Sequence, residues 1–347
     1  MERKFSENGK GFIKMSAIIE IKNVSKEFKV LNRREGLKGS LKDLFSRDYK
    51  ILKAVDNITM DVAQGEMVGY LGPNGAGKST TIKMMTGVLK PTSGQILVDG
   101  NVPYENRSKN AQNIGVVFGQ RTQLWWALPL VESLKLLKDI YQVSDADYKN
   151  MLDLYRSLID IEDLLHKPVR QMSLGQRTLS DIIAAFLHNP KIVFLDEPTI
   201  GLDVAMKANI RTLIHALNKE KNTTVILTTH DMGDVDALCK RIVIIDHGKM
   251  IYDNDMEHLK SFFGSYRTLK VRVVGDAEQE MAEIQKILPD FAMSTDEDWV
   301  SIVVDEDKAK IIDVLAELQK SRNIRDMKTE EISTEEVIKR IYSGESK

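Results

Sequence analysis

The chain has 347 residues, of which 42% are hydrophobic and 29% are charged, and its formal net charge is −2. This length allows two domains, the composition is ordinary for a protein with a buried core, and a charge near zero gives no general attraction to nucleic acid. The single cysteine, Cys239, excludes an internal disulfide and fits a reducing cytosol; we expect it to be a packing residue.

Residues 1–16 are expected to be a disordered lead, because they are mostly polar and lack the apolar core of a signal peptide. Met15 offers an alternative start. No run of the sequence approaches the roughly 18–20 apolar residues that a bilayer crossing needs. We therefore expect that the chain does not span a membrane by itself.

Residues 17–24 alternate apolar and polar side chains, which predicts a strand, and residues 54–63 repeat the pattern. Residues 26–53 lie across these two segments and carry nine Lys/Arg against four Asp/Glu. Leu37, Leu41, Leu44 and Phe45 recur there at helical spacing, which predicts a short basic amphipathic helix. That helix is either an insertion packed on its own domain or a contact with membrane headgroups or a membrane partner.

A glycine-rich loop follows the apolar run 67–71 and precedes a helix-like segment. It reads Gly72-Pro73-Asn74-Gly75-Ala76-Gly77-Lys78-Ser79-Thr80. Glycines allow several backbone N–H groups to surround phosphate oxygens, and the following helix adds positive charge at its N-terminus. Lys78 then reaches the β- and γ-phosphates and Ser79 ligates Mg²⁺. The pattern predicts that the chain binds a nucleoside triphosphate.

Strands and helices alternate through the next 170 residues. Apolar or β-branched runs predict strands at 95–98, 114–118, 191–196, 223–229, 241–246 and 250–252. Residues 128–166 are mostly helical by pattern, and further helices are predicted at 179–187 and 203–221. Continuous apolar strands alternating with helices favour an α/β fold with a largely parallel sheet.

Polar side chains end three of these strands. Asp196 and Glu197 close the strand 191–196, His230 follows the strand 223–229, and Gln120 follows the strand 114–118. Ligands bind at the carboxyl ends of strands in such sheets. Asp196 suits a Mg²⁺ ligand, Glu197 suits a group that aligns and deprotonates water, and His230 can hydrogen-bond the γ-phosphate. Gln120 can contact Mg²⁺ or the water.

Residues 265–347 form an acidic segment with 13 Lys/Arg against 19 Asp/Glu. Its pattern predicts the order strand, helix, strand, strand, helix, strand, which is the βαββαβ arrangement of a ferredoxin-like module, followed by a helix at 334–342. It carries no catalytic motif. We expect a small α+β accessory domain with an interaction or regulatory role.

These motifs together resemble the ATP-binding cassette (ABC) family. The resemblance implies a P-loop cassette over residues 17–264, with a parallel core, an antiparallel β subdomain and a helical subdomain at about 121–175. Further residues match family positions: Phe28 the adenine-stacking aromatic, Gln120 the Q-loop glutamine, Asp203 the D-loop aspartate, and His230 the switch histidine. The segment Met172-Ser173-Leu174-Gly175-Gln176 is similar to the family signature, whose usual first and third residues are replaced here.

The resemblance also implies partners. The signature of one cassette closes on ATP held by another, so a second nucleotide-binding subunit, either another copy or a paralogue, completes the site. A single cassette is similar to the cytoplasmic ATPase subunit that sits on the inner face of the plasma membrane through a multi-span permease. Gly201-Leu202-Asp203 and the acidic C-terminal extension resemble the ABC-2 type, largely exporters. Trp125 and Trp126 are expected either to contact the partner or to pack in the core.

Two other functions remain open at this stage. A cassette ATPase that acts on nucleic acid or ribosomes usually shows two cassettes, a long coiled-coil insertion or a basic surface, and this sequence has none of them. A phosphate-loop kinase leaves residues 172–176 without an explanation.

Overall fold

The computed structural model describes residues 17–31, 49–119, 121–262, 266–318 and 324–342. The expected lead, Gln120 and residues 32–48, which include the predicted basic helix, lie outside these ranges. The chain divides into two compact units, Met1–Asp253 and Asn254–Lys347, and each is described by itself.

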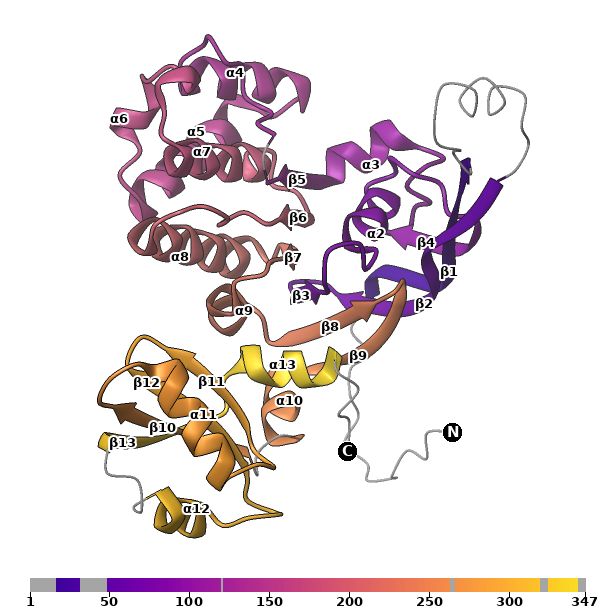
Figure 1. The fold of residues 1–347 in the computed structure, drawn as a ribbon. Helices are drawn as coiled ribbons and strands as arrows, with labels where there is room; N and C mark the ends of the chain where they lie inside the picture. The colour runs from indigo at the N-terminus through magenta and orange to yellow at the C-terminus, as the bar shows by residue number, and fades with distance from the viewer. Residues whose placement is uncertain (1–16, 32–48, 120, 263–265, 319–323, 343–347) are drawn as a thin grey trace, which may run out of the picture. The chain divides into compact units, whose positions relative to one another are not determined.

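A six-stranded sheet forms the centre of the first unit (Figure 1). Its strands lie in the order β5-β6-β7-β3-β8-β9, and the pairs from β5 to β8 are parallel. They are β3 (Met67–Leu71), β5 (Ile114–Phe118), β6 (Ile192–Asp196), β7 (Thr224–Thr228), β8 (Arg241–Asp246) and β9 (Lys249–Asp255). The predicted parallel sheet is thus confirmed. Its strands are apolar runs because both faces are covered.

Helices cover one face of this sheet, and a second sheet covers the other. In Figure 1, α7 (Leu174–Phe186), α8 (Val204–Lys221) and α9 (Met232–Leu238) lie on one side. On the other, α2 (Lys78–Met85) packs between the sheet and the three-stranded sheet β2-β1-β4, with α3 (Arg107–Asn113) nearby. One core joins these layers; it includes Ile82 and Met85 of α2, Ile19 of β1 and Phe194 of β6.

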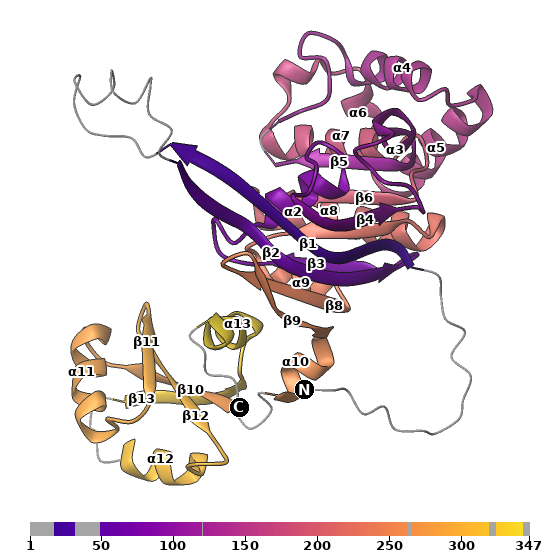
Figure 2. The same cartoon turned by 90° about the vertical axis from the view of Figure 1, so that its right-hand side faces the viewer.

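The three-stranded sheet is antiparallel, and its first two strands extend beyond the segments predicted at residues 17–24 and 54–63. Its strands are β1 (Ala17–Leu31), β2 (Tyr49–Ala63) and β4 (Ser93–Val98). Residues 26–31 of the basic segment belong to β1 and residues 49–53 to β2, while the residues that predict the short basic helix, 37–45, lie outside the described ranges. Phe28 pairs with Leu52 there, and Lys29 with Ile51. β-Branched and aromatic side chains favour this pairing, and Figure 2 shows the two long strands side by side.

A helical region connects β5 to α7. It contains α4 (Leu130–Ile140), α5 (Asp145–Leu158), α6 (Glu162–Leu165) and a 3₁₀ turn at Val169–Gln171. The predicted helical character of residues 128–166 is confirmed. The buried Tyr155 hydroxyl of α5 donates to the Ile183 carbonyl oxygen at 2.8 Å, so this region is anchored to α7.

The second unit contains a four-stranded antiparallel sheet in the order β11-β12-β10-β13. Its elements are α10 (Met256–Phe262), β10 (Tyr266–Val273), α11 (Ala277–Ile287), β11 (Ala292–Asp296), β12 (Trp299–Asp305), α12 (Ile311–Leu318), β13 (Ile324–Glu331) and α13 (Thr334–Tyr342). From β10 to β13 they follow the predicted order of strands and helices. The unit begins before residue 265 and includes α10, whose Met256 and Leu259 are buried.

Candidate functional site

The glycine-rich loop and the polar strand ends meet at one edge of the parallel sheet. Gly72 follows β3, Asp196 ends β6, and His230 lies two residues after β7. Because β6, β7 and β3 are consecutive parallel neighbours, their carboxyl ends lie together. A cavity of about 190 Å³ opens there, lined by seven residues of the loop 72–80 region, by Ala54 and by Glu197. The structure therefore brings the predicted phosphate loop and the predicted water-positioning carboxylate to the same cavity.

The loop backbone needs glycine at two positions for different reasons. Gly77 caps α2 with φ 111°, in the left-handed region, and a Cβ there would collide with the Ala54 carbonyl oxygen. A Cβ on Gly72 would lie 2.5 Å from the Ile245 carbonyl oxygen. Both glycines thus allow the loop backbone to lie close to neighbouring carbonyl groups, with the N-terminus of α2 directed at the cavity.

Lys78 is buried at the first position of α2. Its Nζ donates to the carbonyl oxygens of Gly72, at 2.5 Å, and Pro73, at 3.2 Å. Burial lowers the pKa of Lys78, and the nearby Glu197 and Asp196 carboxylates oppose that shift. The ammonium group is thus held by weak neutral acceptors beside the cavity, where an anionic ligand would be a stronger partner.

Oxygen atoms suited to a hard cation lie next to Lys78. Ser79 is exposed and lines the cavity, while Asp196 is half-buried at the end of β6. Thr228 donates to Asp196 Oδ1 at 2.5 Å, which orients that carboxylate and leaves its second oxygen available. Among the described residues no group of three or more His, Cys, Asp or Glu side chains forms a ready-made metal site. A site of this kind fits Mg²⁺, which takes few protein ligands alongside phosphate oxygens.

The side chains of Glu197 and His230 meet across the ends of β6 and β7. The Nε2 atom of His230 lies 2.7 Å from Oε1 of Glu197, and 47% and 27% of the two side chains are exposed. Glu197 has φ 52°, a left-handed conformation that is uncommon outside glycine. Its backbone N–H donates to the Thr228 carbonyl oxygen at 2.9 Å, so the turn is fixed to β7. The arrangement places a carboxylate and an imidazole together at the cavity edge.

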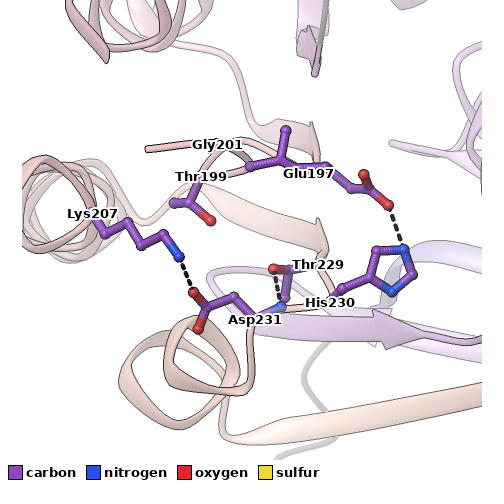
Figure 3. A pocket seen from close by; sticks show the side chains of 8 residues that line it. Glu197, Thr199, Gly201, Lys207, Thr229, His230 and Asp231 are labelled. Atoms are coloured by element: carbon purple, nitrogen blue, oxygen red, sulfur yellow. Dashed lines mark hydrogen bonds and ion pairs between the residues drawn. The ribbon is translucent and has the colours of Figure 1, made fainter. Parts of the chain in front are cut away.

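A second cavity of about 280 Å³ adjoins this pair (Figure 3). Its lining includes Glu197, Thr199, Lys207, His230 and Asp231. Figure 3 shows the Glu197 and His230 side chains directed toward one another, with the Lys207–Asp231 ion pair on the opposite side. Glu197 therefore lies between the phosphate-loop cavity and this one.

The predicted signature residues begin a helix. Ser173 caps α7 and accepts from Gln176 N–H, while Gln176 Oε1 accepts from Ser173 N–H, both at 3.2 Å. Gly175 packs against α8, since a Cβ there would lie 2.6 Å from Cγ of Met206. Gly175 thus has a packing reason within its own chain, while Ser173 and Leu174 stay exposed.

The remaining predicted residues lie on separate elements. Asp203 caps α8, accepting from Met206 N–H at 2.8 Å. Phe28 is half-buried on β1, with Lys26 Nζ 5.2 Å from its ring centroid. Gln120 lies outside the described residues. The signature residues, Asp203 and Phe28 are not among the residues that line the phosphate-loop cavity.

The structure also places the single cysteine and the two neighbouring tryptophans. Cys239 is buried and packs near Gly69, as predicted, and burial raises its thiol pKa to about 12. It directly follows α9. Trp125 and Trp126 are 38% and 53% exposed, so core packing is the wrong one of their two interpretations.

Sequence reasoning missed the threonines and acids behind the Glu197–His230 pair. Thr228 orients Asp196, and buried Asp234 accepts hydrogen bonds from Thr199 and Thr229. Thr228 and Thr229 end the strand 223–229, where threonines also fit ordinary β-branched strand composition, and Thr199 and Asp234 lie in other segments with no signal of their own.

The family model for ABC transporters matches residues 55–200. The ABC transporter ATP-binding protein NatA of Bacillus subtilis is 33% identical over 215 residues, 62% of this chain and 87% of that protein. The chain belongs to the ATP-binding cassette family. The bacitracin transport ATP-binding protein BcrA of Bacillus licheniformis is 35% identical over 212 residues, 61% of this chain and 68% of that protein.

Solved ABC structures share the fold. The ATP-binding subunit of an ABC transporter superposes with TM-score 0.58 at 26% identity, covering 71% of this chain and 93% of that one. A dimeric ATP-binding cassette in a post-hydrolysis state, bound to ADP and Pi, gives TM-score 0.56 at 26% identity, covering 69% and 98%. This ABC chain is accordingly an ATPase, and the predicted cassette fold is confirmed.

Proposed function

We propose that this ABC ATPase powers transport through a membrane permease carried by a separate chain, with export as the direction. The observation that carries the proposal is the Glu197–His230 pair at the edge of the phosphate-loop cavity. It supplies the groups that convert nucleotide binding into hydrolysis. Relatives that are named as transport ATP-binding proteins support coupling to transport. The Gly201-Leu202-Asp203 segment and the acidic C-terminal unit support the ABC-2 exporter type.

The proposed mechanism starts with nucleotide binding. The backbone N–H groups of residues 72–80 bind the phosphates, and Lys78 exchanges its loop carbonyls for β- and γ-phosphate oxygens. Ser79, Asp196 and Gln120 would hold Mg²⁺, which neutralises phosphate charge when bound. Phe28 stacks on the adenine.

Hydrolysis then depends on the strand ends. Glu197 orients the attacking water and accepts its proton, and His230 holds the Glu197 carboxylate and donates toward the γ-phosphate. The 2.5 Å hydrogen bond from Thr228 holds the Asp196 carboxylate in place, apart from the carboxylate of Glu197. These roles explain why two acids follow one another at the end of β6.

The site is proposed to close against a second nucleotide-binding subunit. Ser173 and Leu174 are exposed at the start of α7, Gly175 and Gln176 shape that turn, and Asp203 caps the neighbouring helix. An exposed helix start offers N–H groups to the γ-phosphate of a nucleotide held by the other subunit. The dimeric cassette structures support this arrangement.

A permease contact is proposed near Trp125 and Trp126, with the cassette held at the cytoplasmic membrane face through that partner. The Arg177 guanidinium lies 5.3 Å from the Trp126 ring centroid, which keeps that exposed ring oriented. Within the described ranges, no helix combines the length and the apolarity that crossing a bilayer requires.

Affinity purification of the full chain from gently solubilised membranes tests the partner. We expect a multi-span membrane protein to copurify in a fixed ratio, and Trp126→Ala to weaken its recovery. Exposed Ile140→Ala, on α4, is the matched control. Recovery of ribosomes or nucleic acid without a membrane protein would contradict the proposal.

A further inference from the structure

A buried carboxylate lies behind the Glu197–His230 pair. Asp234, the third residue of α9, is fully buried. Its Oδ2 accepts hydrogen bonds from the hydroxyls of Thr199 and Thr229, the latter at 3.0 Å. Its Oδ1 accepts from Arg211 Nε at 2.6 Å. One side chain therefore holds three separate segments: the loop after β6, the residue after β7, and α8.

The two threonines are close in the chain to the catalytic pair. Thr199 lies two residues after Glu197, and Thr229 directly precedes His230. Both threonines are buried, whereas 27% of the Glu197 side chain and 47% of the His230 side chain are exposed. Because surrounding side chains enclose the pair only in part, its geometry depends on how the backbone beneath it is held.

Asp231 links this network to two basic side chains of α8. Asp231 N–H donates to the Thr229 hydroxyl at 3.0 Å, and the Asp231 carboxylate pairs with Lys207 at 2.5 Å and with Arg211 at 3.2 Å. Figure 3 shows Thr229 and Lys207 on either side of Asp231. Arg211 thus compensates the buried charge of Asp234, which lowers the free-energy cost of burying that carboxylate.

We propose that Asp234 is a positioning residue for ATP hydrolysis, because it fixes the ends of β6 and β7 at the separation that lets Glu197 meet His230. This inference rests on the proposed role of Glu197. Asp234 lines neither the phosphate-loop cavity nor the adjoining one. Its contribution is therefore expected in the turnover number and not in nucleotide affinity.

The test removes the two hydroxyls without changing charge or shape. In full-length Thr199→Val/Thr229→Val, kcat for Mg·ATP should fall about 30-fold, since small misplacements of catalytic groups cost rates of this order. The equilibrium dissociation constant for ATP should stay within about twofold of wild type, as Lys78 and the loop are untouched. Thr199→Ser/Thr229→Ser restores both hydroxyls and should restore kcat.

The matched control is Thr212→Val on the exposed face of α8, whose hydroxyl donates to the Ala208 carbonyl oxygen of its own helix. If the double valine variant does not fold, the single variants Thr199→Val and Thr229→Val carry the same test, each with a several-fold loss of kcat.

Two results would overturn the inference: turnover equal to wild type in the valine variants, or equal losses of kcat and ATP affinity that serine does not rescue. Glu197→Gln measured alongside separates the two proposals. If Glu197→Gln is inactive while the valine variants are fully active, only the positioning role fails. If Glu197→Gln retains full turnover, the role proposed for Glu197 fails first.

Discussion

Replacing Glu197 by glutamine keeps the shape of the side chain and removes its ability to accept a proton. The amide can still contact His230 across the present 2.7 Å distance, so local geometry is retained. General-base catalysis is worth about 10²–10⁴ in rate, and we expect kcat to fall by that factor, or about 3–5 kcal/mol in barrier height. The free energy of unfolding should change by less than about 1 kcal/mol, because a partly exposed pair of polar side chains contributes little.

Phosphate release measures kcat, equilibrium binding measures ATP affinity, and sedimentation measures dimer formation. The glutamine variant should bind ATP like wild type and accumulate as an ATP-bound dimer. Glu220→Gln, on the exposed last turn of α8, is the matched control. Phosphate release by Glu197→Gln within threefold of wild type would refute the assignment of Glu197 as the group that activates water.

Two further predictions concern stability. Gly77→Ala should unfold at a lower denaturant concentration and lose ATP binding, because its Cβ collides with the Ala54 carbonyl oxygen. Gly100 also has a positive φ but a Cβ there meets nothing within 4 Å, so an equal loss in Gly100→Ala would contradict the role of this collision. Burial raises the pKa of Asp181 to about 6, so the wild type loses stability as pH rises from about 4 through 6. The free energy of unfolding of Asp181→Asn, measured relative to wild type, should rise by about 3 kcal/mol from pH 4 to pH 7. A difference that does not change with pH would argue against the shift.

The local sequence predicted the groups whose chemistry requires a contiguous motif. Lys78 and Ser79 follow from the glycine pattern, and Asp196 and Glu197 follow from two acids that end an apolar run. The parallel sheet could also be predicted, since strands buried on both faces must be apolar throughout.

Contacts between distant segments could not be predicted in this way. Gly175 packs against Met206 in another helix, and Asp234 collects hydrogen bonds from Thr199 and Arg211. None of these pairs leaves a periodic signal in the sequence. The strand pairing of Phe28 with Leu52 was missed because the alternating pattern that predicts these two strands ends at residue 24 and resumes only at residue 54.

The most direct test of the account is phosphate release from Mg·ATP by the full chain copurified with its membrane partner, compared between wild type and Lys78→Ala. Lys78 lines the phosphate-loop cavity, and its Nζ donates there to two backbone carbonyl oxygens. The account predicts saturable phosphate release by wild type and a loss of about 100-fold or more in Lys78→Ala. Equal phosphate release by the two proteins would contradict it.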